Sequence, residues 1–144
     1  MRYVPAMRNL LLCTVLGLAA AAGCSKASDP SGASDKAALP TVSVDECDQA
    51  LGKGAQAVDA NGEQTRKKMG VVPGAVLLTD SESFAVSELP ADKAKPLVFY
   101  CANTSCGASH EAASKALTAG YTNVKVMPDG IAGWVKAGKK TQAI

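Results

Sequence analysis

Between residues 41 and 144, short apolar runs alternate with segments in which apolar residues recur at helical spacing. The apolar runs predict strands at 55–58, 76–78, 97–100 and 124–126, after a short β-like segment at 41–43. The helical spacing predicts helices at 44–51, 109–119 and 130–136, with a helix or loop at 61–69. Strands that alternate with helices predict an α/β domain, in which helices flank both faces of a central, mostly parallel sheet.

Local signals indicate where two of these helices begin and end. Ser43 and Glu46 have the spacing of a capping box at the start of the first helix. Ser109 is the expected N-cap of the helix at 109–119, and Gly120 is its expected C-cap. Segment 82–89 fits neither pattern, and Pro90 interrupts it.

The first 23 residues have the features of a lipoprotein signal peptide. Arg2 and Arg8 precede an apolar stretch at 10–22, which is shorter than the ~20 residues that a membrane-spanning helix needs. The stretch ends in Ala-Ala-Gly-Cys24, which resembles the motif in which bacterial lipoproteins are cleaved and lipidated on the cysteine. Cleavage nearby by an ordinary secretory route is the alternative, and the chain starts at Met1 or Met7.

A segment without large apolar residues, apart from Leu39, follows Cys24. Residues 25–40 are rich in Ser, Ala, Asp, Gly and Pro, a composition that predicts a flexible tether. We therefore expect a signal peptide at 1–23, lipidated Cys24 and its tether at 24–40, and one domain at 41–144. The anchor places the domain in the bacterial cell envelope, and Ser25 after Cys24 favours the outer membrane, facing the periplasm.

The charge balance argues against a nucleic-acid partner. Without segment 1–23, the chain has 13 basic and 13 acidic residues. The basic run 66–68 is then most simply a solvated face of the domain.

The chemistry of the chain is concentrated between residues 97 and 111. The strand at 97–100 ends at Cys101, a small polar loop contains Cys106, and an Ala-rich helix follows. A cysteine that faces a helix N-terminus lies where free backbone N–H groups favour the thiolate, so we expect the pKa of Cys101 to lie well below its ordinary value. The alternative is that Cys101 is only a small buried apolar residue.

Six fragments, in this order, resemble a single rhodanese-like domain. They are Asp59 and residues 70–75 (GVVPGA), 98–101 (VFYC), 112–113 (AA), 119–124 (AGYTNV) and 129–134 (DGIAGW). The family's Asp-Val-Arg strand end is matched here only at Asp59, and its Gly-His-Ile-Pro-Gly-Ala motif lacks the histidine. The resemblance implies a parallel sheet flanked by helices.

The resemblance also implies an activity centred on Cys101. In such domains this cysteine accepts a sulfane sulfur as a persulfide and transfers it to a thiophilic acceptor, which makes the chain a sulfurtransferase candidate. The family's usual loop continues with four residues and then an arginine, whereas this chain has Cys106 at that position. Without the arginine, thiosulfate-type turnover is not expected. Amides of Asn103, Thr104, Ser105 and Gly107 are candidates to bind the substrate.

Cys106 has two open interpretations, beside the alternative that its position is a coincidence without function. As a resolving thiol, it attacks a persulfide or sulfenate on Cys101 and leaves a disulfide, which a periplasmic reductant must reduce. As half of a permanent disulfide, it rigidifies the loop. Besides sulfur transfer, two classes of function therefore remain: a thiol–disulfide redox module that uses both cysteines, and a non-catalytic binding module.

The other candidate residues carry weaker signals. Cys47 is expected to fill the core, and Trp134 to pack the last helix. His110 is expected to be exposed at the helix start, with proton transfer near Cys101 as the alternative. We expect no metal and no cofactor. The expected partners are a small sulfur donor or thiol acceptor, and the membrane through the lipid anchor.

Overall fold

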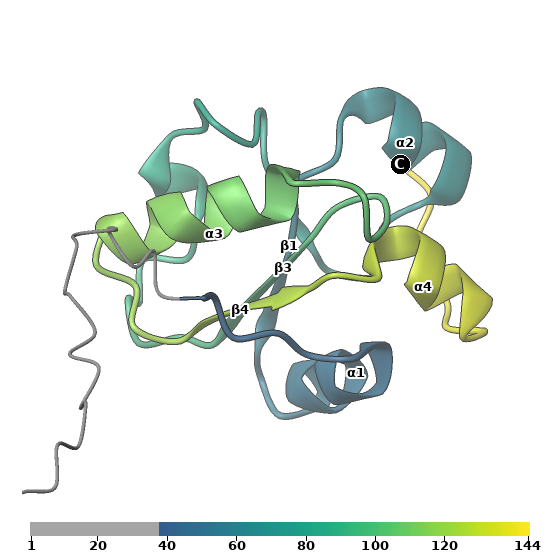
Figure 1. Cartoon of the computed structure of the whole chain (residues 1–144), viewed down its shortest axis with the longest axis horizontal. Coiled ribbons are helices and arrows are strands. Elements are labelled where there is room, and N and C mark those ends of the chain that lie inside the picture. Colours follow the sequence, from purple (N-terminus) through teal and green to yellow (C-terminus); the bar gives the residue numbers. More distant parts are fainter. Residues whose placement is uncertain (1–37) are drawn as a thin grey trace, which may run out of the picture. The chain divides into compact units, whose positions relative to one another are not determined.

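A computed structural model of the protein describes residues 38–144, which form a four-stranded sheet and four helices (Figure 1). The strands are all parallel and lie in the order β2-β1-β3-β4. The strands are β1 (Gln56–Asp59), β2 (Val76–Leu77), β3 (Leu97–Tyr100) and β4 (Val124–Met127). The helices are α1 (Val44–Gly52), α2 (Glu63–Met69), α3 (Ala108–Thr118) and α4 (Gly130–Lys136), with a short 3₁₀ helix η1 (Val86–Glu88). The predicted parallel α/β architecture is confirmed.

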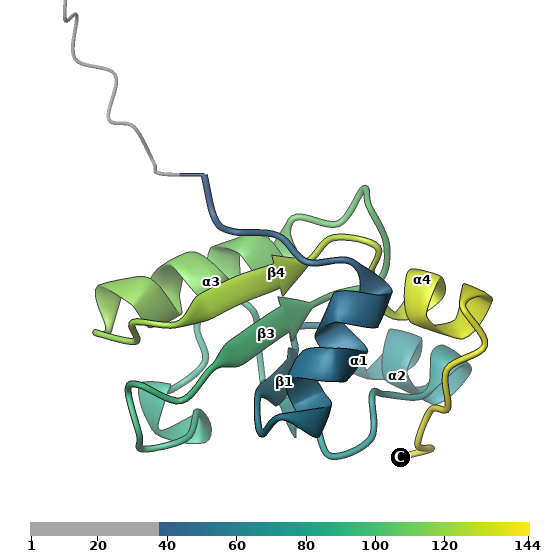
Figure 2. The same ribbon diagram turned by 90° about the horizontal axis from the view of Figure 1, so that it is seen from below.

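The central strand β3 contributes side chains to both faces of the sheet. Because side chains alternate along a strand, Leu97 and Phe99 pack on the face covered by α3, whereas Val98 and Tyr100 pack against α1 and α4. The two views of the ribbon show α3 and α1 on opposite sides of the sheet (Figure 2). Every residue of β3 is buried, as a parallel strand covered on both faces requires.

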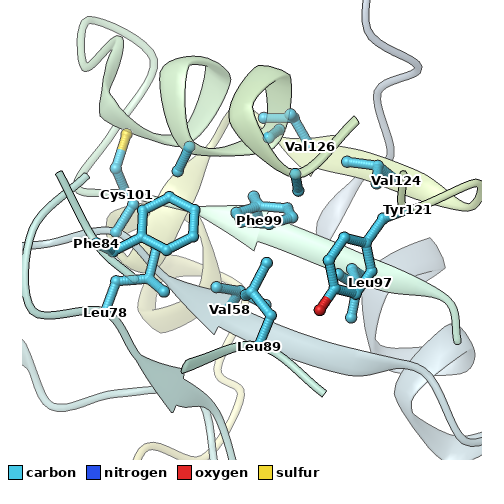
Figure 3. Packing of buried hydrophobic residues seen from close by; sticks show 14 residues of the cluster. Val58, Leu78, Phe84, Leu89, Leu97, Phe99, Cys101, Tyr121, Val124 and Val126 are labelled. Atoms are coloured by element: carbon cyan, nitrogen blue, oxygen red, sulfur yellow. The ribbon is translucent and has the colours of Figure 1, made fainter. Parts of the chain in front are cut away.

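The same alternation places Cys101, directly after β3, on the α3 face. It lies at one end of a cluster that also contains Leu78, Phe84 and Phe99 (Figure 3). Its sulfur points toward the helix α3, which contributes buried alanines to the cluster. The fold thus holds the candidate nucleophile between the sheet and α3, at the carboxyl end of the central strand.

A buried ion pair at the carboxyl end of β1 corrects one prediction. Arg66 of α2 is only 9% exposed, so it does not belong to a solvated face with Lys67 and Lys68. Its Nε lies 3.2 Å from Oδ1 of fully buried Asp59. Its Nη2 donates to the backbone oxygens of Asp59 at 3.0 Å and of Leu78 at 2.8 Å. Arg66 therefore links α2 to the last residue of β1 and to Leu78, the residue that follows β2.

The first helix begins as the sequence predicts. The Ser43 hydroxyl accepts a hydrogen bond from the Glu46 amide at 3.3 Å, and the Ser43 amide donates to Glu46 Oε2 at 2.8 Å. This capping box satisfies two of the amides that have no partner within a helix.

The folded domain begins slightly before residue 41, the predicted boundary. Leu39 packs against the α3-side cluster, and the Pro40 carbonyl accepts the Val126 amide at 2.9 Å. The predicted signal peptide, Cys24 and most of the tether lie outside the described residues. Within residues 38–144, no helix combines the length and the apolar character needed to cross a bilayer.

Candidate active site

The first turn of α4 fixes the backbone that directly follows the Cys101 side chain. The Ile131 amide donates to the Cys101 carbonyl at 2.8 Å, and the Ala132 amide donates to the Ala102 carbonyl at 2.9 Å. Gly130, which has a φ of +60°, starts this turn. A Cβ at Gly130 would lie 2.5 Å from the Cys101 carbonyl oxygen, so only glycine permits this close approach.

The Cys101 sulfur is enclosed by its own loop and by α3. Cys101 as a whole is only 1% exposed. Sγ lies 3.1 Å from the Cys106 carbonyl oxygen, to which the thiol donates, and 3.4 Å from the Ser109 hydroxyl. Both partners are polar groups in an otherwise apolar cluster, so they orient the thiol.

The environment of Cys101 overturns the predicted direction of its pKa. Burial, followed by the hydrogen bond with Cys106, raises the pKa of the Cys101 thiol. The Ser109 hydroxyl and amide act in the opposite direction without outweighing them. The prediction of an acidic Cys101 is therefore wrong for this state of the molecule, because burial has a larger effect than the nearby helix N-terminus.

The pKa of Cys106 shifts in the opposite direction to that of Cys101. Partial burial disfavours the Cys106 thiolate, but interactions with the Cys101 side chain and with the backbone of Ala102 and Ala108 together lower the pKa of Cys106. The more acidic thiol of the pair is therefore Cys106, which is also the more exposed one. Both thiols are free, as is Cys47.

The loop between the cysteines is shaped by a turn centred on Asn103. Its side-chain Oδ1 accepts the Ser105 amide at 3.0 Å, and its carbonyl accepts the Cys106 amide at 3.1 Å. This Asx-type turn presents Cys106 opposite Cys101. Because the amides of Ser105 and Cys106 already have partners within the turn, they are not free to bind an anion in this conformation.

The structure brings some predicted site residues together and leaves others apart. Thr104, Ser105, Gly107 and His110 are exposed, and the side-chain hydrogen bonds of Cys101 go to Cys106 and Ser109 rather than to His110. Among residues 38–144, no three His, Cys, Asp or Glu side chains form a group that could hold a metal ion. Cys101, Cys106 and Ser109 are therefore the residues that the structure brings together at the candidate site.

A cleft of about 620 Å³ lies beside the loop. Asn103 and Thr104 line it together with Asp45 of α1, Asp129 before α4 and Lys136 of α4. Neither Cys101 nor Cys106 belongs to its lining. A molecule in this cleft would contact the loop rather than the sulfur atoms.

Ser109 is a site residue that the sequence reasoning assigned to a different role. The helix α3 begins at Ala108 with Gly107 as its N-cap, so Ser109 does not cap it. Instead Ser109 is 1% exposed and faces Cys101. The available signal was helical periodicity, because Ser109 shares a face with the buried residues Ala112, Ala113 and Ala116.

Two further predictions concern the opposite face of the sheet and are confirmed. Cys47 is fully buried in the core, where burial, followed by the charge of Asp48, raises its pKa to about 11. Trp134 packs in the same cluster and donates its indole N–H to the Lys140 carbonyl at 2.8 Å. Cys47 is consequently an unreactive thiol, which makes it a natural control for the two loop cysteines.

Comparisons with known proteins agree with this architecture. The profile of the Rhodanese-like domain family matches residues 43–137, whereas no curated protein matches the chain. Because the match spans well over half of the sequence, the protein belongs to the rhodanese-like domain family.

Solved structures with the same fold share about one residue in five with this chain. The BH2092 protein of Bacillus halodurans is 20% identical with a TM-score of 0.63, covering 72% of this chain and 77% of its own. The rhodanese-like domain of Anabaena Alr3790 is 20% identical with a TM-score of 0.56, covering 73% and 80%. SseA of Escherichia coli, a 3-mercaptopyruvate sulfotransferase, is 20% identical with a TM-score of 0.57, covering 74% and 52%. At this identity the likeness establishes the fold.

Proposed function

We propose that the protein is a sulfurtransferase that carries a sulfane sulfur as a persulfide on Cys101. The observation that carries this proposal is the position of the thiol. Cys101 ends the central strand of a rhodanese-like domain, with a second thiol in its loop and a serine hydroxyl 3.4 Å from its sulfur. The cysteine thiolate attacks the outer sulfur of the donor to form the persulfide, and it is the leaving group when the acceptor attacks that sulfur.

The loop favours a thiol-bound sulfane sulfur over thiosulfate as the donor. A doubly charged anion needs a cation at the site, and the position of the family's loop arginine is occupied by Cys106. Glutathione persulfide and similar small persulfides make no such demand, because their sulfane sulfur is bonded to a thiol sulfur. We therefore propose a small persulfide or polysulfide as the donor and a thiol as the acceptor.

Mass spectrometry of the isolated protein, before and after treatment with glutathione persulfide, tests the proposal. We expect a gain of one sulfur atom on Cys101, and a Cys47→Ala control should gain the same sulfur. Two unmodified, alkylatable loop thiols after treatment would contradict sulfur transfer and leave the binding module as the remaining class.

A thiol–disulfide redox module is the second candidate, because the loop contains two free thiols and the Cys101 thiol donates to the backbone carbonyl of Cys106. In this reaction a substrate disulfide or peroxide accepts two electrons and two protons from Cys101 and Cys106, which form a disulfide that an external dithiol then reduces. The same mass spectrum separates the candidates, since a loss of two hydrogens across Cys101 and Cys106 marks the redox reaction.

We further propose that Cys24 anchors the domain by a lipid to the outer membrane, on its periplasmic side. The support is the apolar stretch at 10–22 followed by Ala-Ala-Gly-Cys24. In bacteria, the wild type should partition into detergent with the membranes, and Cys24→Ala should lose labelling by a fatty-acid analogue. A wild-type protein recovered without lipid in the soluble fraction would contradict the anchor.

A further inference from the structure

The two loop thiols differ in how easily an external molecule reaches them. Cys101 is 1% exposed, and its sulfur is covered by the Cys106 carbonyl and by the Ser109 hydroxyl. The cleft beside the loop does not reach it either. Cys106 is only half-buried and lies on the exposed stretch of the loop between Ser105 and Gly107.

The reactivity of the two thiols follows the same order as their exposure. The pKa of Cys106 is lowered, because the Cys101 thiol and two backbone amides outweigh its partial burial, whereas burial raises the pKa of Cys101. The thiolate fraction of Cys106 is therefore larger than that of Cys101 at a given pH. Each pKa unit between two thiols changes the ratio of their thiolate fractions about tenfold.

We propose that Cys106, rather than Cys101, is the thiol that first accepts sulfur from the donor, and that it then transfers this sulfur to Cys101. This inference rests on the proposed function and adds a second catalytic residue to it. It also gives the cysteine at the position of the family's arginine a chemical role in loading.

The two steps balance in atoms and electrons. In the first step, the Cys106 thiolate attacks the outer sulfur of a small persulfide RSSH. The donor's S–S bond breaks, RSH leaves with the proton, and the sulfane sulfur is bonded to Cys106 as an ionised persulfide.

In the second step, the Cys101 sulfur attacks that same outer sulfur. A bond forms between Cys101 Sγ and the sulfane sulfur, and the bond from Cys106 Sγ breaks. The proton of Cys101 passes to Cys106. Because one sulfur–sulfur bond forms as another breaks, the step is neither a net oxidation nor a net reduction. The lower pKa of Cys106 makes it the better leaving group, which favours transfer toward Cys101.

Time-resolved loading of the full chain tests the order of the two thiols. The reduced wild type, Cys101→Ser, Cys106→Ser and a Cys47→Ala control are mixed with glutathione persulfide, quenched with iodoacetamide and analysed by peptide mass spectrometry. In wild type and in the control, the added sulfur should appear first on Cys106 and later on Cys101. Cys101→Ser should retain sulfur on Cys106, and Cys106→Ser should load Cys101 more slowly than wild type does.

Loading of Cys101 in Cys106→Ser at the wild-type rate would overturn the proposed order. So would sulfur that appears on Cys101 before Cys106 in wild type, a result that does not depend on how well a variant folds. If neither thiol of the wild type acquires sulfur, the proposed function itself fails. A failed order and a failed function therefore give different spectra.

Discussion

At the scale of single residues, the Ser109 hydroxyl is the closest polar side chain to the Cys101 sulfur, at 3.4 Å. Its hydrogen bond favours the thiolate and so opposes the effect of burial on the pKa of Cys101. We expect Ser109→Ala to raise this pKa further and to slow alkylation of Cys101 at pH 8 several-fold, about tenfold for each pKa unit. Ser114→Ala, a substitution further along α3, is the control.

Peptide mass spectrometry of partly alkylated protein measures this effect at each cysteine separately. Alkylation of Cys106 should change less than that of Cys101 in Ser109→Ala. Equal alkylation rates of Cys101 in Ser109→Ala and in wild type would show that the hydroxyl does not act on the sulfur.

The ion pair between Arg66 and Asp59 is a second feature that depends on single side chains. The Asp59 side chain is fully buried, and Arg66 is its charged partner at 3.2 Å. Because Arg66→Ala leaves a buried carboxylate without compensation, we expect the free energy of unfolding to fall by about 3 kcal/mol. Lys67→Ala, on the exposed face of the same helix, should change it by less than about 1 kcal/mol.

Urea unfolding followed by circular dichroism measures both variants. If Arg66→Ala were as stable as Lys67→Ala, the buried pair would not hold α2 against the sheet. The pair also shows a limit of local sequence reasoning. In the run 66–68 nothing distinguishes Arg66 from its lysine neighbours, and its partner lies seven residues earlier, in a different element.

At the scale of secondary-structure elements, the contact between α4 and the end of β3 positions the reactive loop. Gly130 permits it, because its φ is +60° and a Cβ there would meet the Cys101 carbonyl. We expect Gly130→Ala to lower the free energy of unfolding by about 1 to 3 kcal/mol and to change the alkylation rate of Cys101.

Gly138→Ala is a matched control for this substitution. Gly138 has a φ of +72°, but a Cβ there would meet no atom within 4 Å. It should therefore cost stability through its backbone conformation without changing the reactivity of Cys101. If both variants altered Cys101 reactivity equally, the close contact at Gly130 would not position the site.

The elements themselves were largely predictable from the sequence. β3 and α4 have the predicted bounds, because a short apolar run follows Pro96 in one case and helical spacing begins at Gly130 in the other. The start of α3 was less predictable, since both Gly107 and Ser109 are acceptable N-caps. The sequence signal does not choose between them, whereas packing of Ser109 against Cys101 does.

The pKa values of the thiols were not predictable for a similar reason. The neighbourhood of a helix N-terminus is visible in the sequence, and it favours a thiolate at Cys101. The burial of Cys101 depends on packing with α3 and with Phe84, which lies in a different segment of the chain. Burial then determines the direction of the pKa shift.

At the scale of the whole molecule, buried thiols link stability to alkaline pH. Burial, then the charge of Asp48, raises the pKa of Cys47 to about 11. The unfolded chain therefore loses this proton first, and the stability it contributes, complete below pH ~8.5, is lost as the pH rises toward 11. We expect the free energy of unfolding to fall over this range, by up to about 1 kcal/mol per pH unit from this thiol.

Urea unfolding at several pH values between 8 and 11 compares wild type with Cys47→Ala. The variant should be less stable at pH 8, because it leaves a cavity in the core. Its stability should then fall less steeply with pH than that of wild type, although Tyr100 and Cys101, whose pKa values are also raised, keep some slope in both proteins. Parallel curves would contradict the contribution of Cys47.

The most direct test of the function is the rate of sulfane-sulfur transfer from glutathione persulfide to cyanide, a thiophilic acceptor. Wild type should catalyse this transfer, and Cys101→Ser should fall to the uncatalysed rate, because the Cys101 persulfide is the species that delivers the sulfur. Cys47→Ala should retain the wild-type rate. A Cys101→Ser protein that transfers sulfur at the wild-type rate would contradict the assignment of Cys101 as the carrier.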